Sequence, residues 1–291
     1  MFFSDFNYNY YTIMKRLLLS IAAILLSAGL ISAQEASLQA ATELFNNGAT
    51  ASSTDKEAAL DFFQKAYDMA GKLGDEGADI IANCKEVIPK LHYSMVNDFI
   101  KETKYDEALD KLAETVAAAK DFGADEVLAN AQKLIPQVQL QKGNALLTAK
   151  DYQGAADVYK AITDADPKNG MAALRLGMAL SQLGNSEAAI AALKAAAANG
   201  QEANANKQLG SVLLKEASNF LRDKDYQKAF DTAVESAGYA ESANAFKIAG
   251  TAANSLSKKA EAIEYLGKYL ELSPDASDAA QIKAVIDALK K

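Results

Sequence analysis

Few residues of this 291-residue chain could catalyse a reaction or hold a metal ion. The sequence has one histidine, His92, and one cysteine, Cys84, eight positions apart. Eight residues span about 12 Å of α-helix, so we interpret Cys84 as a buried structural residue and His92 as partly exposed, with a catalytic pair as the alternative. The sequence contains no glycine-rich phosphate loop and no nucleophile elbow. It therefore predicts that the chain is not an enzyme, with no metal and no cofactor.

The composition indicates which kind of fold must position the remaining polar residues. Half of the residues are hydrophobic, only four are proline, and tryptophan is absent. This balance favours helices packed closely on helices, so we expect an all-α fold. The formal net charge of −8 argues against a nucleic-acid partner, because neutralising phosphates needs a surplus of lysine and arginine.

The N-terminal segment has the pattern of an export signal. Lys15 and Arg16 form a charged region, residues 17–31 are apolar, and Ser32-Ala33 supplies the small residues of a cleavage site. We expect cleavage after Ala33. The apolar run of 15 residues is shorter than the roughly 18 to 20 that a spanning helix needs, and an uncleaved anchor is the alternative. The prediction is an exported protein, periplasmic or secreted, without a membrane span in the mature chain.

The domain organisation follows from this signal and from the repeats described below. Met14 stands directly before the basic pair, so we expect the true start there, with a genuine upstream extension over residues 1–13 as the alternative. The extension plus signal peptide covers 1–33, a helical repeat domain covers 34–276, and a capping helix covers 277–291. The capping helix is predicted from apolar residues spaced along one face, namely Ile282, Val285, Ile286 and Leu289.

A fixed spacing of small residues recurs along the chain. Gly143, Gly177 and Gly250 each stand twelve positions before an alanine, and the first two glycines are 34 apart. The alanines are Ala155, Ala189 and Ala262, with a large residue four positions later (Tyr159, Leu193, Leu266) and, in two units, a proline twelve positions later (Pro167, Pro274). A glycine inside a helix is about 1 kcal/mol less favourable than alanine, so we expect it to allow two antiparallel helices to approach closely.

These residues resemble the tetratricopeptide repeat, a 34-residue helical hairpin with Leu-Gly, then alanine and a large residue, then proline. Leu176-Gly177, Leu180 and Ala189 match that pattern, and Tyr152 opens a second helix in the neighbouring unit. The tryptophan of the pattern is absent throughout, and the unit at Ala189 lacks the proline. The resemblance implies an all-α, right-handed α-solenoid of antiparallel helix pairs.

Parts of the chain depart from the 34-residue spacing. Gly210 lies 19 positions before Ala229, near Tyr226, which predicts a first helix lengthened by about two turns. The openings Tyr105-Asp-Glu-Ala108 and Tyr152-Gln-Gly-Ala155 are 47 apart, which predicts elongated helices in the N-terminal half. We also expect Ala58 with Phe62 to open the earliest unit, and Pro89 and Pro136 to be first-turn or kink residues.

The resemblance implies that a partner binds in the concave groove lined by the first helix of each repeat. Carried over position by position, the inward residues are Lys90, Tyr93, Asn97, Ile100, Lys101, Gln137, Leu140, Asn144, Leu147, Thr148, Met171, Leu174, Met178, Ser181, Gln182, Asn204, Lys207, Ser211, Leu214, Lys215, Asn244, Lys247, Thr251, Asn254 and Ser255. None of these 25 is acidic and five are lysine, so we expect a partner that is acidic or has a free carboxylate. The alternative is that first helices lack acidic residues for packing reasons alone.

Some members of the family hold a C-terminal carboxylate with lysine, asparagine and arginine from successive repeats. Asn144 and Arg175 occupy positions that fit parts of such a clamp, but Leu140 and Met171 stand where basic residues would be expected. We therefore expect an amide-rich groove in which Met171 and Met178 are adaptable contacts, with a packing role as the alternative.

Together these features predict a non-enzymatic protein–protein interaction scaffold or adaptor of the cell envelope that binds a partner peptide or helix. An alternative is a periplasmic protein that binds a small molecule or glycan in nutrient capture. A third interpretation places the partner on the convex face or on the long early hairpins. The sequence leaves the oligomeric state and the identity of the partner open.

Overall fold

The computed structural model describes residues 37–291, and every regular element within that range is a helix. This confirms the predicted all-α class. The predicted signal peptide, with its cleavage after Ala33, lies outside the described residues. The described range forms two compact units, one made of residues 37–92 with 118–124 and the other of residues 93–117 with 125–291.

The first unit is built on a hairpin of α2 (Leu38–Ala51) and α3 (Lys56–Gly71), followed by the short 3₁₀ turn η1 (Gly74–Gly77) and the beginning of α4 (Ala78–Lys101). Its core contains Ala59, Phe63 and Cys84, each almost fully buried. The register expected here was wrong by one residue, because Ala59 and Phe63 point inward where Ala58 and Phe62 were predicted. Cys84 is a buried structural residue as expected, and its Sγ donates to the Phe63 carbonyl at 3.5 Å.

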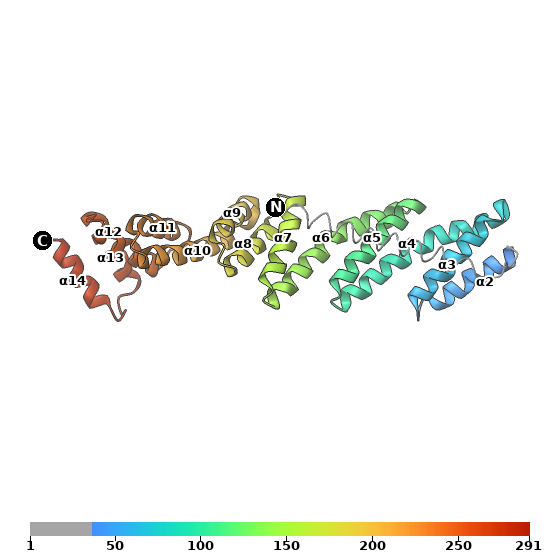
Figure 1. Ribbon diagram of the computed structural model, residues 1–291, viewed down its shortest axis with the longest axis horizontal. Coiled ribbons are helices and arrows are strands. Elements are labelled where there is room, and N and C mark those ends of the chain that lie inside the picture. The colour runs from blue at the N-terminus through green and yellow to red at the C-terminus, as the bar shows by residue number, and fades with distance from the viewer. Residues whose placement is uncertain (1–36) are drawn as a thin grey trace. The chain divides into compact units, whose positions relative to one another are not determined.

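Elongated helices occupy the N-terminal half, as predicted (Figure 1). α4 and α6 (Asp125–Thr148) are each 24 residues long and α5 (Tyr105–Phe122) has 18, whereas α8 (Gly170–Gln182) has 13. Pro89 and Pro136 are each the twelfth residue of their helix and not first-turn residues. Each proline removes one backbone donor from the middle of a helix that nevertheless continues past it.

The second unit continues with helix pairs whose members pack against each other (Figure 1). The pairs are α6 with α7 (Tyr152–Ala165), α8 with α9 (Ser186–Ala196), α10 (Glu202–Arg222) with α11 (Tyr226–Tyr239), and α12 (Ala243–Ser255) with α13 (Lys259–Leu272). A helix, α14 (Ala279–Leu289), lies within the range 277–291 where a capping helix was expected and packs on α13, and its role as a cap stays a prediction. The expected solenoid of antiparallel helix pairs is thus confirmed.

The repeated glycines lie where the two helices of a hairpin touch. A Cβ atom added to Gly143, Gly177 or Gly250 would stand 2.6 Å from the side chain of the residue 16 positions later. Those residues are Tyr159, Leu193 and Leu266, all at most 1% exposed. We call this line of contact the seam, and it confirms that the glycines serve close helix approach.

The hairpin of α10 and α11 shows how the longer spacing is accommodated. The seam position twelve residues before Ala229 is Ala217, which is fully buried against Ala229 and Ala233. Gly210 lies seven residues earlier on α10 and contacts Ala240, seven residues beyond the position opposite Ala217. Seven residues are about two helical turns, so both α10 and α11 keep the same face toward each other. The lengthened first helix is confirmed, with Ala217 rather than Gly210 at the regular seam position.

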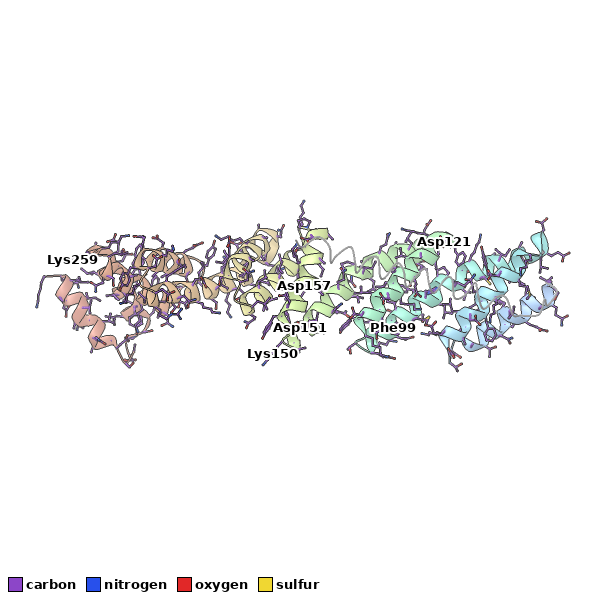
Figure 2. The ribbon with its side chains drawn as sticks, in the orientation of Figure 1. Phe99, Asp121, Lys150, Asp151, Asp157 and Lys259 are labelled. Atoms are coloured by element: carbon purple, nitrogen blue, oxygen red, sulfur yellow. The ribbon has the colours of Figure 1, made fainter. Side chains whose placement is uncertain are left out.

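The turns that precede α5, α7, α9, α11 and α13 share one geometry. The residue two positions before the second helix has positive φ at Thr103, Lys150, Gly184, Lys224 and Ser257. The next residue then donates its N–H to a carbonyl five positions back, as from Asp151 to Leu146 at 2.9 Å. In three turns that residue also caps the new helix with its side chain, and Lys150 and Asp151 of one such turn are labelled in Figure 2.

The unit at Ala189, which lacks the proline, ends its second helix α9 by another means. After α9, Asn199 leaves helical geometry and Gly200 takes φ +84°, within the segment η2 (Ala197–Gln201). The Asn199 carbonyl lies so close to Gly170 that a Cβ there would be 2.1 Å away. A glycine in the left-handed region ends this helix where proline follows the ends of α7 and α13.

We expect opposite effects from Gly→Ala substitutions at two positions where no atom lies within 4 Å of the added Cβ. Gly184→Ala should lower the free energy of unfolding by about 1 kcal/mol, because φ is +78° there. Gly267→Ala, in the middle of α13, should raise it by about 0.5–1 kcal/mol. Thermal melting followed by circular dichroism measures both, and a shift of the same sign in the two variants would contradict the backbone explanation.

Candidate partner-binding face

Two hollows lie on a surface formed by α6, α8, α10 and α12, which we call the first-helix face. α8 contacts α10, and α10 contacts α12. The smaller hollow, of about 330 Å³, is lined by Leu147, Thr148, Tyr152, Arg175, Met178, Ser181, Gln182 and Gln208. The larger, of about 740 Å³, is lined by Ser211, Leu214, Lys215, Ser218, Asn219, Leu221, Asn244, Lys247, Ile248 and Thr251. Both lie within the second unit.

The charged residues that line the two hollows are all basic. They are Arg175 in the smaller hollow and Lys215 and Lys247 in the larger one, and no aspartate or glutamate lines either. The other polar linings are hydroxyl and amide side chains, which can donate hydrogen bonds as well as accept them. The first-helix face is therefore neutral to positive at its hollows, although the chain carries a net charge of −8.

Arg175 is the most unusual of these residues. Its Nε is buried and has no hydrogen-bond partner. Within residues 37–291 it also forms no ion pair, and its positive charge acts on Tyr159, whose pKa it tends to lower. A guanidinium with a buried, unsatisfied donor is unstable relative to one that is hydrogen-bonded, so this position favours an added acceptor.

The two lysines of the larger hollow differ in their surroundings. Lys215 is exposed and has no carboxylate partner within the described part of the chain. Lys247 donates to Asp278 at 2.5 Å, and its Nζ lies 5.4 Å from the ring centroid of Tyr269. The hydrogen bond raises the pKa of Lys247 and, with a bond from Tyr269, lowers the pKa of Asp278.

Asn144 has a structural role that its position in the sequence does not reveal. Its Oδ1 accepts a hydrogen bond of 2.8 Å from the hydroxyl of Tyr159. Tyr159 is fully buried, and burial raises its pKa to about 12. Asn144 therefore satisfies a buried donor behind the seam, and it lines neither hollow.

Of the 26 residues predicted to line the groove, which are the 25 inward residues and Arg175, the structure brings twelve to the hollows. Those in the smaller hollow are Leu147, Thr148, Arg175, Met178, Ser181 and Gln182, and those in the larger one are Ser211, Leu214, Lys215, Asn244, Lys247 and Thr251. The fourteen that line neither are Lys90, Tyr93, Asn97, Ile100, Lys101, Gln137, Leu140, Asn144, Met171, Leu174, Asn204, Lys207, Asn254 and Ser255.

Several residues outside the hollows bond within their own helix. Lys90 pairs with Glu86 at 2.7 Å and Lys101 with Asp98 at 3.7 Å. Asn97 donates to the backbone carbonyl of Tyr93 at 3.2 Å. The structure therefore gives these α4 residues local partners, and a binding role for them stays a prediction.

Five residues that line the hollows were not predicted from the sequence, namely Gln208, Ser218, Asn219, Leu221 and Ile248. Tyr152 also lines the smaller hollow, although only a role in the repeat was predicted for it. Ser218 and Leu221 follow Ala217 by one and four, so counting back from Ala229 would have found them. Ile248 stands two positions before Gly250, as Arg175 does before Gly177 and Lys215 before Ala217. Lys215 was predicted from its distance to Gly210 and Arg175 as part of a clamp, but this shared position before the seam was not used to predict Ile248.

Helix pairs joined by a fixed turn and packed along a small-residue seam define the chain as a helical repeat protein. Residues 140–207 match the family model described as tetratricopeptide repeat. This segment contains the regular hairpin of α8 and α9, with its seam at Gly177. Residues 140–207 are thus a segment of tetratricopeptide repeats, and repeats of this kind form scaffolds for protein–protein interaction.

Comparison with solved structures finds other proteins of this kind. MamA from Desulfovibrio magneticus RS-1, from residue 41 to its end, is 21% identical, with 65% of this chain and 97% of that chain covered at a TM-score of 0.36. YrrB, described as a TPR protein with an unusual peptide-binding site, is 19% identical over 67% and 91% at 0.40. PilW, described as a widely conserved type IV pilus biogenesis factor, is 14% identical over 67% and 98% at 0.35. No curated protein sequence matches the chain.

Residues 37–291 contain neither a candidate membrane-spanning helix nor a candidate metal site. No helix there has the length and apolar character needed to cross a membrane. No group of three or more histidine, cysteine, aspartate or glutamate side chains there is arranged to hold a metal ion.

Asn144→Ala should lower the free energy of unfolding more than Tyr159→Phe does. The first variant leaves the hydroxyl of Tyr159 buried without its partner, which costs about 1–3 kcal/mol. The second leaves an exposed asparagine that water can solvate, at about 1 kcal/mol. Urea denaturation of the two variants measures the difference, and an equal loss would show that the bond does not satisfy a buried donor.

The raised pKa of Tyr159 also predicts a dependence on pH. A tyrosine of the unfolded chain ionises near pH 10 and Tyr159 near pH 12, so the native state keeps this proton longer. The contribution of Tyr159 to the free energy of unfolding is fully present below about pH 10 and is lost as the pH rises through 12. Relative to Tyr159→Phe, the wild-type chain should therefore lose stability over this range in parallel melting experiments. A constant difference between the two proteins would contradict the burial of the hydroxyl.

Proposed function

We propose that this chain is a non-enzymatic scaffold of the cell envelope that binds an acidic or carboxylate-terminated segment of a partner protein on the first-helix face. The observation that carries the proposal is Arg175, whose buried Nε has no acceptor in a hollow without carboxylates. The location in the envelope rests on the signal pattern of residues 15–33, which the described residues do not include.

A carboxylate is the group that fits Arg175 best. The guanidinium offers donors in a planar fork that matches the two oxygens of a carboxylate. Thr148, Ser181 and Gln182 surround it with neutral polar groups that can bind neighbouring backbone. Because no acidic side chain lines the hollow, an entering carboxylate meets no like charge at close range.

The larger hollow extends the same surface along α10. Gln208 lines the smaller hollow and Lys215 the larger one, and seven residues of helix separate them by about 10 Å. An extended partner segment spans that distance with three or four residues. A segment with acidic residues at such a spacing could place one of them in each hollow.

A small-molecule or glycan ligand receives less support from the geometry. Tyr152 is the one aromatic side chain that lines these two hollows, so they offer little surface on which a sugar ring could stack. Thermal-shift measurements with sugars test this alternative, because a specific ligand at 100 times its Kd stabilises the protein by about 2.7 kcal/mol.

Replacement of Arg175 by glutamine should reduce capture of the partner at least about tenfold, since hydrogen bonds to charged groups contribute about 1.5–3 kcal/mol. The mature chain, immobilised and exposed to its own envelope extract, provides the measurement. Arg222→Gln is the matched control, because Arg222 is exposed, pairs with the adjacent Asp223 and lines neither hollow.

Both arginine variants should keep the helical signal and melting temperature of the wild type. A captured protein that Arg175→Gln retains as well as the wild type does would exclude Arg175 as the anchor. Loss of capture in both variants to the same extent would point instead to a general effect of net charge.

A further inference from the structure

Asp278 stands immediately before α14 but does not cap that helix. Its side chain makes no hydrogen bond to the first-turn N–H groups of α14. Its Oδ1 accepts from the hydroxyl of Tyr269 at 2.5 Å, and its Oδ2 accepts from Nζ of Lys247 at 2.5 Å. Asp151, Asn185 and Asp225, by contrast, each cap the helix that follows them. The carboxylate of Asp278 is thus used for contacts with α12 and α13.

Lys247 takes part in both the larger hollow and the contact with α14. It lines the larger hollow, and it holds Asp278 at the start of the capping helix. Its side chain is 41% exposed and that of Asp278 is 23% exposed, so water and solutes reach the pair. An ammonium on a flexible stem can turn toward another carboxylate without moving its helix.

The capping helix has few other attachments. Ile286 is the one buried residue of α14, with Ile282, Val285 and Leu289 half-buried beside it. Within the described chain, α13 is the helix against which α14 mainly packs. The bonds of Asp278 with Tyr269 and Lys247 are therefore a substantial part of what fixes the N-terminal end of α14.

We infer that an acidic partner segment in the larger hollow binds Lys247 in competition with Asp278, so that binding loosens α14 from α13. The inference rests on the proposed function and adds a second carboxylate-binding position to it. The hollow contains no competing acidic side chain, so Asp278 is the group that an entering carboxylate would replace. Because coupling between two sites is reciprocal, removing the carboxylate of Asp278, which competes for Lys247, should strengthen binding of the partner segment.

The test uses a fluorescein-labelled hexaglutamate peptide with a free C-terminal carboxylate, titrated by anisotropy at low ionic strength. Asp278→Asn should tighten its binding about two- to fivefold, the range of an exposed ion pair. Asparagine is as good a residue as aspartate at the start of a helix, so the variant leaves that preference unchanged. Hydrogen exchange of residues 279–289 should be faster in this variant, and faster in the wild type once the peptide is bound.

Asp275→Asn is the matched control, because it removes the same charge from an exposed residue of the same loop that bonds no other described residue. It should change neither affinity nor exchange. Lys247→Gln should weaken peptide binding and speed exchange in α14. Equal tightening in Asp278→Asn and Asp275→Asn would reduce the effect to net charge and overturn the inference.

The arm with Arg175→Gln separates this inference from the proposed function. Binding that depends on Arg175 but responds to neither Asp278→Asn nor Lys247→Gln would overturn the competition and leave the acidic partner supported. Binding that responds to the latter two but not to Arg175→Gln would support the competition and remove Arg175 as the anchor. Absence of peptide binding in every variant would contradict both.

Discussion

Close approach of two helices at one small residue is the constraint on which the hairpins depend. At Gly143, Gly177 and Gly250 the space of a Cβ is already filled by a residue of the second helix, so a larger residue fits only if that side chain or its helix shifts. Because the distance to the second-helix alanine is constant, each first helix enters its hairpin in the same rotational phase. The residue two positions before the seam then falls on the same side each time, and in α8 and α10 that residue is Arg175 or Lys215. The seam thus sets both the packing of the core and the positions at which positive charge meets the solvent.

The spacing in the sequence was sufficient to predict this seam, the hairpins around it and the long N-terminal helices. The spacing did not predict the seam position of α10, where alanine stands in place of glycine. Ala217 is one of many alanines in the sequence, and only its contacts with Ala229 and Ala233 identify it as that position. Pro89 and Pro136 were expected to be first-turn or kink residues, and the first-turn part of that expectation was wrong. A proline usually marks a helix end, yet α4 and α6 continue past Pro89 and Pro136, since tertiary packing on both sides of one lost hydrogen bond outweighs its absence. The earliest unit shifted by one residue because no glycine–alanine pair with the regular gap fixed its register.

The candidate site shows a different limit of sequence analysis. Asn144 and Arg175 were both predicted from position as groups that could hold a carboxylate. Asn144 accepts the hydroxyl of buried Tyr159, whereas Arg175 has a buried donor with no acceptor. The two residue types are equally plausible in a binding groove, and what separates them is whether the protein already satisfies their hydrogen bonds. For Asn144, the hydrogen-bond partner is Tyr159, which lies 15 positions later in the second helix. A pattern of positions within the first helices cannot predict that contact.

The second helix α13 is covered by the single helix α14, in contrast to the second helices that pack on the first helix of a following pair. Here α14 covers α13 with one narrow apolar stripe, and a polar contact supplements it at the N-terminal end of the helix. Such a contact is partly exposed and contributes little to stability, so it holds the N-terminal end of α14 only weakly. A partner carboxylate needs no large interaction energy to compete with an ion pair of that strength. Because this contact is weak, binding of a carboxylate to Lys247 in the larger hollow would be able to loosen α14.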